Sequence, residues 1–307
     1  MRYPLTTLLF ILSFCFLLNS CQKEISPEGG NIIITPPAFG DSSYLSKIYY
    51  VYYDASGVDT AAVFTYTYDN LKRVIALTDS TSDPAAPNPY IASTYYYNGN
   101  DTLPFKTRTY TSETSYYDTT ITFHFYDVSG KKTKDSILKS FSTFPIINHY
   151  SALIVSNYSY VPGKIYGFTS YSSTSSTLAG YKDTAVLDAK GNLTSNKKYK
   201  LDPSNSPNYE LYVVSNIAYN NNPSPFSKLS NFKSYIVFPF GETFYEEFVQ
   251  NNNRTHIDEI TIFGAGSTHN YAEDYNTYYY NTNGYPKEVF SQTATDSTRF
   301  IFKYRSF

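Results

Sequence analysis

The sequence predicts an all-β protein, built as one long antiparallel up-and-down meander of about 18 strands that coils or closes into a barrel-like sheet. Three observations support this prediction. The chain holds 35 Tyr and 22 Phe, and aromatic side chains suit a pleated, half-buried surface. These aromatic residues alternate with polar ones, which is the two-residue period of a strand. Turn-forming clusters recur at short intervals, and no segment after the first 20 residues combines a helical period with caps.

Residues 1–20 are predicted to be a signal peptide. Arg2 supplies a positive start, and the apolar run from Leu8 to Leu18 is too short to span a bilayer core of about 30 Å. The tetrapeptide Leu18-Asn19-Ser20-Cys21 then resembles the lipobox of bacterial lipoproteins. That resemblance implies cleavage before Cys21 and its acylation with chains such as palmitate, which would anchor the mature protein to the outer membrane. Ordinary secretion and an uncleaved anchor are the alternatives.

Residues 21–44 are predicted to be a flexible tether, because prolines and glycines concentrate between Glu24 and Ser43. Within the tether, Gln22-Lys23-Glu24 resembles the short signal that directs Bacteroidota-type lipoproteins to the cell surface. A solvated charged linker is the alternative interpretation. The other cysteine, Cys15, lies in the predicted signal peptide, so the mature chain would have no thiol available for a disulfide.

Residues 45–307 are predicted to form a single all-β domain in which one strand-and-turn unit repeats. The alternation is clearest at Phe64, Tyr66 and Tyr68, at Phe123 and Phe125, at Tyr278 and Tyr280, and at Phe300, Phe302 and Tyr304. Turn clusters recur about every 30 residues, beginning at Asp69, Asn98, Asp127, Asp188, Asn220, Asn251 and Asn281. A second set, which includes Pro239, falls between them, so each half-interval holds one strand. We expect the aromatic side chains to line one inner face, and closure to remove the exposed sheet edges.

Several turns resemble degenerate tyrosine-aspartate (YD) repeats, the hairpins of Rhs-type and teneurin-type proteins. The matching segments are Tyr68-Asp69, Tyr126-Asp127-x-x-Gly130, Leu187-Asp188-x-x-Gly191 and Tyr280-Asn281-x-x-Gly284. Asp or Asn caps such a turn through its side chain, and Gly supplies positive φ. The segment from Ile217 to Phe226, followed by Asn251 to Asn253, is similar to Bacteroidota surface lipoproteins of an uncharacterised family. That resemblance implies a porin-like β fold from Leu45 to Phe307 and a cell-surface location, but no active site.

The composition argues against a nucleic-acid partner, because 24 basic and 26 acidic residues leave a formal charge of −2. No cofactor, metal site or catalytic residue is predicted. The histidines His124, His149, His256 and His269 form no HExxH motif. We expect His124 to face outward, and we interpret the cluster His256-x-Asp258-Glu259 as a polar strand entry. The sequence also lacks a G-x-S-x-G nucleophile elbow.

A recurrent Asp-Ser/Thr pattern offers candidate modification sites. It resembles the acceptor pattern for O-glycosylation of exported Bacteroidota proteins, and the candidate hydroxyls are those of Thr60, Thr102, Thr119, Ser136 and Thr184. If these residues are modified, their hydroxyls must be exposed. The alternative is that Asp-Thr simply opens strands after turns.

The leading functional hypothesis is a non-enzymatic cell-envelope lipoprotein that binds a glycan or another envelope protein, since Tyr rings can stack on sugars. One alternative is a structural shell or spacer on the cell surface. Another is a polysaccharide-acting hydrolase, which needs two carboxylates facing each other across a cleft. A membrane-spanning barrel is less favoured, because polar residues recur along the strands and the mean hydropathy is −0.37.

Overall fold

The computed structural model describes the greater part of the chain after residue 43. The described ranges are 44–54, 57–81, 91–112, 116–143, 149–173, 179–201, 209–229, 252–262, 269–292 and 297–307. The predicted signal peptide (1–20), its lipidation site Cys21 and nearly all of the predicted tether (21–44) lie outside these ranges. They therefore stay predictions.

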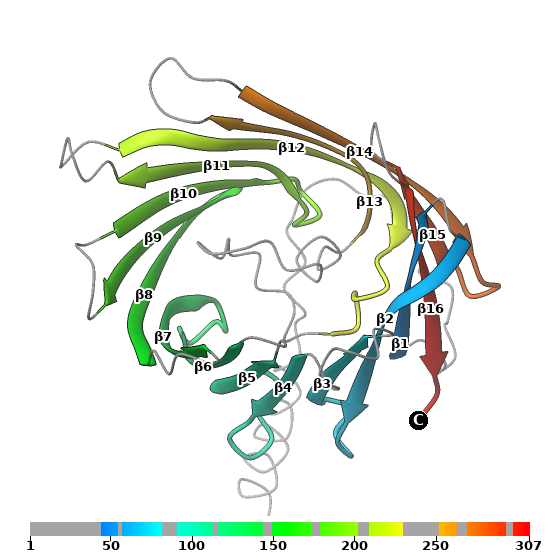
Figure 1. Ribbon diagram of the computed structural model, residues 1–307, viewed down its shortest axis with the longest axis horizontal. Coiled ribbons are helices and arrows are strands. Elements are labelled where there is room, and N and C mark those ends of the chain that lie inside the picture. The colour runs from blue at the N-terminus through cyan, green and yellow to red at the C-terminus, as the bar shows by residue number, and fades with distance from the viewer. Residues whose placement is uncertain are drawn as a thin grey trace, which may run out of the picture. The chain divides into compact units, whose positions relative to one another are not determined.

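The described residues form 16 strands, and these close into one antiparallel barrel (Figure 1). The strands are β1 (Tyr44–Asp54), β2 (Gly57–Tyr68), β3 (Val74–Thr81), β4 (Ile91–Tyr96), β5 (Lys106–Ser112), β6 (Tyr116–Tyr126), β7 (Lys132–Thr143), β8 (His149–Val161), β9 (Lys164–Ser173), β10 (Ala179–Leu187), β11 (Leu193–Leu201), β12 (Tyr209–Pro223), β13 (Asn252–Ile262), β14 (His269–Tyr280), β15 (Pro286–Gln292) and β16 (Ser297–Arg305). Each strand pairs with its sequence neighbours, and β1 closes the sheet on β16. The predicted all-β meander is confirmed, and of the two forms left open by the sequence, coiled or closed, the structure shows the closed barrel.

The described residues form 16 strands, against about 18 expected, and the two expected strands without a described counterpart fall between β12 and β13, where residues 230–251 lie outside the described ranges. Two strands were expected there, on either side of a turn at Pro239. Instead β12 pairs directly with β13, and residues 224–229 form a turn that is not part of the sheet. Phe226 and Leu229 in this turn are almost fully buried. These two apolar side chains therefore fill the barrel instead of joining a strand.

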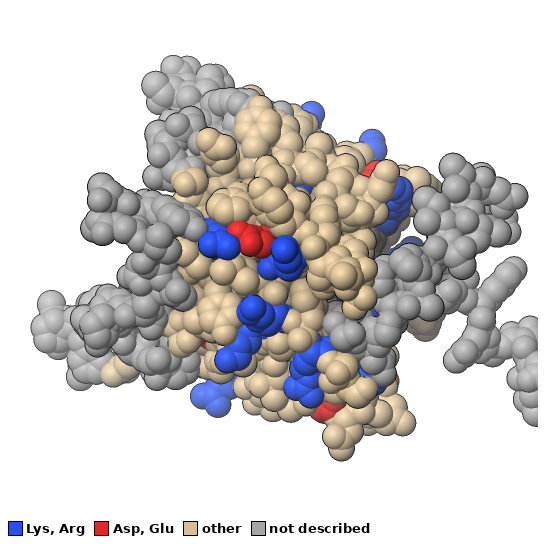
Figure 2. All heavy atoms as spheres, turned by 90° about the vertical axis from the view of Figure 1, so that its right-hand side faces the viewer, with Lys and Arg blue, Asp and Glu red and all other residues tan. Residues whose placement is uncertain are grey.

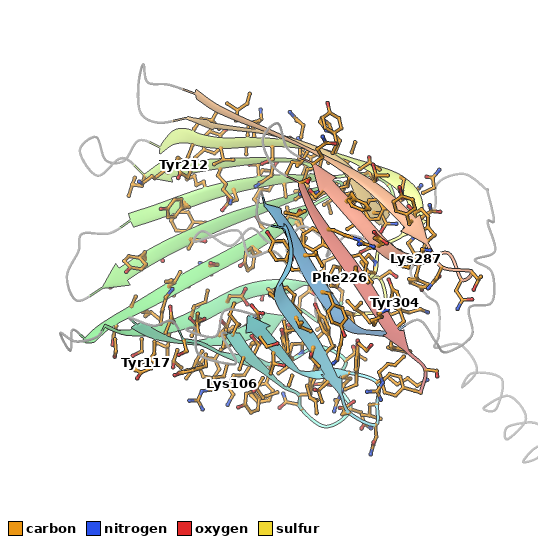
Figure 3. The ribbon with its side chains drawn as sticks, turned by 45° about the vertical axis from the view of Figure 1, so that its right-hand side comes forward. Lys106, Tyr117, Tyr212, Phe226, Lys287 and Tyr304 are labelled. Carbon is orange, nitrogen blue, oxygen red and sulfur yellow. The ribbon has the colours of Figure 1, made fainter. Side chains whose placement is uncertain are left out.

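Phe226 identifies the inner face of the sheet. Its ring lies 6.5 Å from the ring of Tyr66 on β2, and Figure 3 shows Phe226 behind the wall formed by β1 and β16. Both rings belong to a buried cluster with residues of β1, β2, β3, β15 and β16 and of the turn after β12, namely Leu45, Ile48, Phe64, Tyr68, Val74, Leu77, Leu229, Val289, Phe300 and Phe302. We call the sheet face that carries Tyr66 the inner wall and the opposite face the outer wall. The aromatic lining is confirmed for β2 and β16.

The strand register extends the assignment of the inner wall from β2 to β6. On β6 the expected aromatic lining is wrong. Residues directly opposite on paired strands share a face, and the pairs Tyr66↔Leu77, Leu77↔Ser93, Ser93↔Thr109 and Thr109↔Thr120 lead from Tyr66 to β6. Thr120, Thr122 and His124 are therefore on the inner wall. Phe123 and Phe125 point outward and are 36% and 47% exposed. The alternation was predicted, but the inner face of this strand is the polar one.

Four tight turns at one end of the barrel share one geometry, and Asp127 illustrates it. The Asp127 carboxylate accepts hydrogen bonds from the backbone N–H groups of Ser129 and Lys131, at 2.8 and 3.0 Å. Gly130 has a φ of +78°, a conformation that costs a residue with a Cβ about 1–2 kcal/mol. The same side-chain cap begins at Asp69, Asp188 and Asn281. The predicted turn chemistry is confirmed, whereas kinship with YD repeats stays a prediction.

Candidate functional site

The inner wall holds the groups that could contact a ligand, and a ring of tyrosines stands at the short-turn end. Each of these tyrosines donates its hydroxyl hydrogen bond to a backbone carbonyl at or near the start of the preceding strand. Among the described residues the pairs are Tyr68 to Leu45, Tyr97 to Val74, Tyr126 to Pro104, Tyr160 to Lys132, Tyr219 to Leu193, Tyr278 to Arg254 and Tyr304 to Pro286, at 2.5 to 3.0 Å. We call these seven residues the tyrosine girdle.

The tyrosine girdle explains why the chain uses Tyr rather than Phe at these places. A Phe would leave the carbonyl of the preceding strand without its partner. Burial raises the pKa of the phenols of Tyr68, Tyr97, Tyr126, Tyr160 and Tyr304, that of Tyr160 to about 12, so these five stay protonated donors at neutral pH. The signal was present in the sequence as Tyr directly before an Asp or Asn turn, as in Tyr68-Asp69 and Tyr126-Asp127.

Four aspartates on the inner wall are more than nine-tenths buried: Asp79, Asp118, Asp135 and Asp183. Two of them are neutralised by partners. Asp118 pairs with Lys139 on the neighbouring strand at 2.6 Å, and Asp135 lies at the centre of a network. Buried carboxylates are costly unless paired, so these two contribute to a satisfied wall.

The network around Asp135 joins four strands, β5 to β8. Asp135 contacts His124 Nδ1 at 2.7 Å and Lys132 Nζ at 3.3 Å, and it accepts a 3.1 Å hydrogen bond from the Tyr158 hydroxyl. On the other side of the imidazole, Nε2 lies 2.9 Å from Thr107 Oγ1. His124 therefore faces inward, and its predicted outward orientation is wrong, because a buried Asp135 requires donors directly opposite.

Charge and burial set the protonation of this network. Burial would raise the pKa of Asp135, but the Lys132 ammonium and the hydrogen bond from His124 hold it below its usual range. Burial lowers the pKa of His124, although Asp135 opposes this effect. A neutral imidazole then donates from Nδ1 to the carboxylate and accepts at Nε2 from the Thr107 hydroxyl. The result is a chain of hydroxyl, imidazole and carboxylate.

The other two aspartates lack such partners. Asp79 Oδ1 and Asp183 Oδ1 are buried without a hydrogen-bond partner. Burial raises the pKa of Asp79 to about 6, and it raises that of Asp183 to about 7 despite the charge of Lys198. Asn196 Oδ1 on β11 and both amide atoms of Asn276 on β14 are also buried without a partner. The described inner wall therefore presents two kinds of polar group, satisfied and unsatisfied.

The predicted glycosylation sites fall into three groups. Thr102 is exposed in the turn between β4 and β5, and the side chain of Thr60 lies outside the described residues. Thr119, Ser136 and Thr184 are half-buried on the outer wall, and each follows an inward aspartate. The Asp-Ser/Thr pattern thus places the acid inside the barrel and the hydroxyl outside. Their modification stays a prediction.

Of the remaining sequence candidates, the structure describes the side chain of His256. His256 stacks on Tyr275 with ring centroids 4.4 Å apart, and the side chains of Asp258 and Glu259 lie outside the described residues. The described part of the chain contains no group of three or more His, Cys, Asp or Glu side chains that could hold a metal ion. It also contains no helix long and apolar enough to cross a membrane.

Comparison with known proteins finds solved structures of similar fold. No protein-family model matches the sequence, and no curated protein matches it. A crystal structure of a porin-like protein from Bacteroides vulgatus superimposes with a TM-score of 0.52 and 15% identity, covering 87% of this chain and 100% of that one. The chain has a porin-like barrel fold. A porin-like protein from Bacteroides uniformis also matches, with a TM-score of 0.41, 12% identity and coverage of 87% and 100%.

The outer wall of this porin-like barrel has two unlike sectors. From β5 to β9 it carries exposed apolar side chains, namely Tyr110, Tyr117, Phe123, Phe125, Leu138, Leu153, Val161, Tyr166 and Phe168. From β15 to β1 it carries the Glu288–Arg299 ion pair and exposed basic residues that include Lys303 and Arg305. Figure 2, which faces this second sector, shows Lys and Arg spread over the wall. One sector of the outer wall is therefore apolar and the other is charged.

Proposed function

We propose that this protein is a non-enzymatic cell-envelope lipoprotein, anchored to the outer membrane through Cys21 at the cell surface, whose barrel binds a glycan or another envelope protein. The lipobox residues and the porin-like fold support the envelope location. The observation that carries the binding role is the set of inward polar groups without partners: Asp79, Asp183, Asn196 and Asn276.

The inner wall carries both paired and unpaired buried polar groups. Leaving a buried donor or acceptor unpaired costs about 1–3 kcal/mol, and the same wall pairs Asp118 and Asp135 fully. A barrel that served as packing alone would gain stability from apolar residues at the four unpaired positions. Polar groups retained there are explained by a ligand that completes their hydrogen bonds.

The location is tested in intact cells. Cells expressing the wild-type chain and Cys21→Ala are fed a labelled palmitate analogue, fractionated, and treated with a protease that does not cross the outer membrane. We expect label and outer-membrane association in the wild type, loss of both in the variant, and digestion in intact cells. Unlabelled wild-type protein would refute the lipid anchor, and resistance to protease until the cells are lysed would refute surface exposure.

The hydrolase alternative has one observation in its favour, the chain of Thr107, His124 and Asp135. Hydroxyl, imidazole and carboxylate in this order are the arrangement of a nucleophilic triad. The test is release of reducing ends or acyl groups from purified polysaccharides and their esters. Turnover that is abolished by Thr107→Val in a folded protein would replace the binding proposal with a catalytic one.

A further inference from the structure

Two unpaired polar side chains lie next to each other on the inner wall of β10 and β11. The pairs Asp135↔Ser156, Ser156↔Thr169 and Thr169↔Tyr181 carry the inner face from β7 to β10, and Asp183 follows Tyr181 by two residues. Across the ladder, Ala185 is opposite Asn196 and Asp183 is opposite Lys198. Asp183 and Asn196 are therefore diagonal neighbours on one face, about 7–8 Å apart at Cα. Both are more than nine-tenths buried, and the Oδ1 atom of each has no partner.

Gly167 on β9 contributes no side chain to the inner wall beside Asp183. Gly167 is directly opposite Asp183, and a Cβ at position 167 would lie 3.4 Å from Asp183 Cβ and 3.6 Å from Asp183 Oδ2. On the other side, the Tyr158 ring would be 3.8 Å from that Cβ. Because position 167 has no Cβ, the space that a methyl group would occupy between the Asp183 carboxyl group and the Tyr158 ring carries no side-chain atom of residue 167.

We propose that Asp183, Asn196 and Gly167, with the Tyr158 ring beside them, form a subsite for a neutral saccharide on the inner wall of β9 to β11. This inference rests on the binding role proposed above and names its ligand and site. Both unpaired atoms accept hydrogen bonds, so the ligand must bring donors, and sugar hydroxyls do so. The Tyr158 ring offers an apolar face for stacking.

The surrounding charges favour a neutral ligand over a cation. Lys198 stands directly opposite Asp183 and its charge acts on that carboxyl group. A cationic amine bound at Asp183 would meet this ammonium group. The carboxyl group, buried and without a direct ion pair, can also donate a hydrogen bond when protonated, which a hydroxyl accepts as readily as it donates.

The test is calorimetric titration and thermal unfolding of the detergent-solubilised full chain with maltose, cellobiose, lactose and N,N′-diacetylchitobiose. We expect at least one disaccharide to bind saturably and raise the unfolding temperature. Asn196→Leu, which removes the acceptor, should weaken binding about tenfold or more, while the unliganded variant unfolds at the same or a higher temperature. Lys197→Ala, at the next position on the outer wall, is the matched control and should bind like the wild type.

Gly167→Ala keeps the test informative if Asn196→Leu does not fold. A Cβ at position 167 makes ordinary contacts, so this variant should fold and bind several-fold more weakly. Binding unaffected by both variants would overturn the subsite but leave the binding role intact. No binding of any disaccharide by the wild type would overturn both. Binding of the diamine putrescine in place of the sugars would overturn the saccharide assignment.

Discussion

Replacing Asp183 with asparagine should stabilise the barrel at neutral and alkaline pH and change how its stability depends on pH. Burial raises the pKa of Asp183 from 3.8 to about 7. At about 1.4 kcal/mol for each pKa unit, the shift corresponds to about 4 kcal/mol. Because the folded-state pKa is the higher one, this stability is fully present below the unfolded pKa of 3.8, falls as pH rises, and is lost once pH passes about 7. An asparagine remains neutral throughout and avoids that loss.

The assay is urea unfolding of wild type and Asp183→Asn between pH 5 and 9, followed by far-UV circular dichroism. His124 acts in the opposite sense, because burial lowers its pKa from 6.5 and its protonation in the unfolded state favours unfolding at acid pH. The quantity to compare is therefore the difference in unfolding free energy between the two proteins, because His124 contributes equally to both. We expect the variant to gain about 3 kcal/mol of stability over the wild type between pH 5 and 9, because the wild type loses about 1.4 kcal/mol per pH unit only up to the folded-state pKa of about 7. A difference that does not vary with pH, or a variant that is less stable at pH 8, would refute the reasoning.

Three further substitutions test the barrel. Tyr160→Phe removes a girdle hydrogen bond of 2.7 Å and should lower the free energy of unfolding by about 1 kcal/mol, whereas Tyr166→Phe on the outer wall should leave it unchanged; equal effects would contradict the girdle. Phe226→Ala empties a fully buried site and should lower the free energy of unfolding by about 3–5 kcal/mol. The control Phe125→Ala, at an exposed position, should lower it little. A small loss at position 226 would show that the inward turn does not fill the barrel. Gly130→Ala forces a Cβ into a φ of +78° and should lower the unfolding free energy by about 1–2 kcal/mol, so an unchanged urea midpoint would count against the turn geometry.

Local rules predicted much of this fold. Alternation of aromatic and polar residues marks strands because side chains point to opposite faces of a sheet. The turns at Asp127 and Asp188 follow from a side-chain cap and a glycine with positive φ, which are properties of adjacent residues. The same rules expected a strand directly after Asn220 up to Pro239, but they do not tell whether an apolar residue such as Phe226 joins the sheet or fills the space inside it.

The sequence by itself determined the all-β class, the capped turns at Asp69, Asp127, Asp188 and Asn281, and the alternation of aromatic and polar residues in strands such as β2 and β6, since these depend on neighbours along the chain. The tertiary structure alone decided which face of β6 is inside, that His124 meets Asp135, and that Asp183 and Asn196 lie together without partners. The physical reason is that an inner wall exists only after the sheet closes. Burial and pairing across strands then separate a satisfied carboxylate from an unsatisfied one, although both begin as the same Asp-Ser/Thr pattern in the sequence.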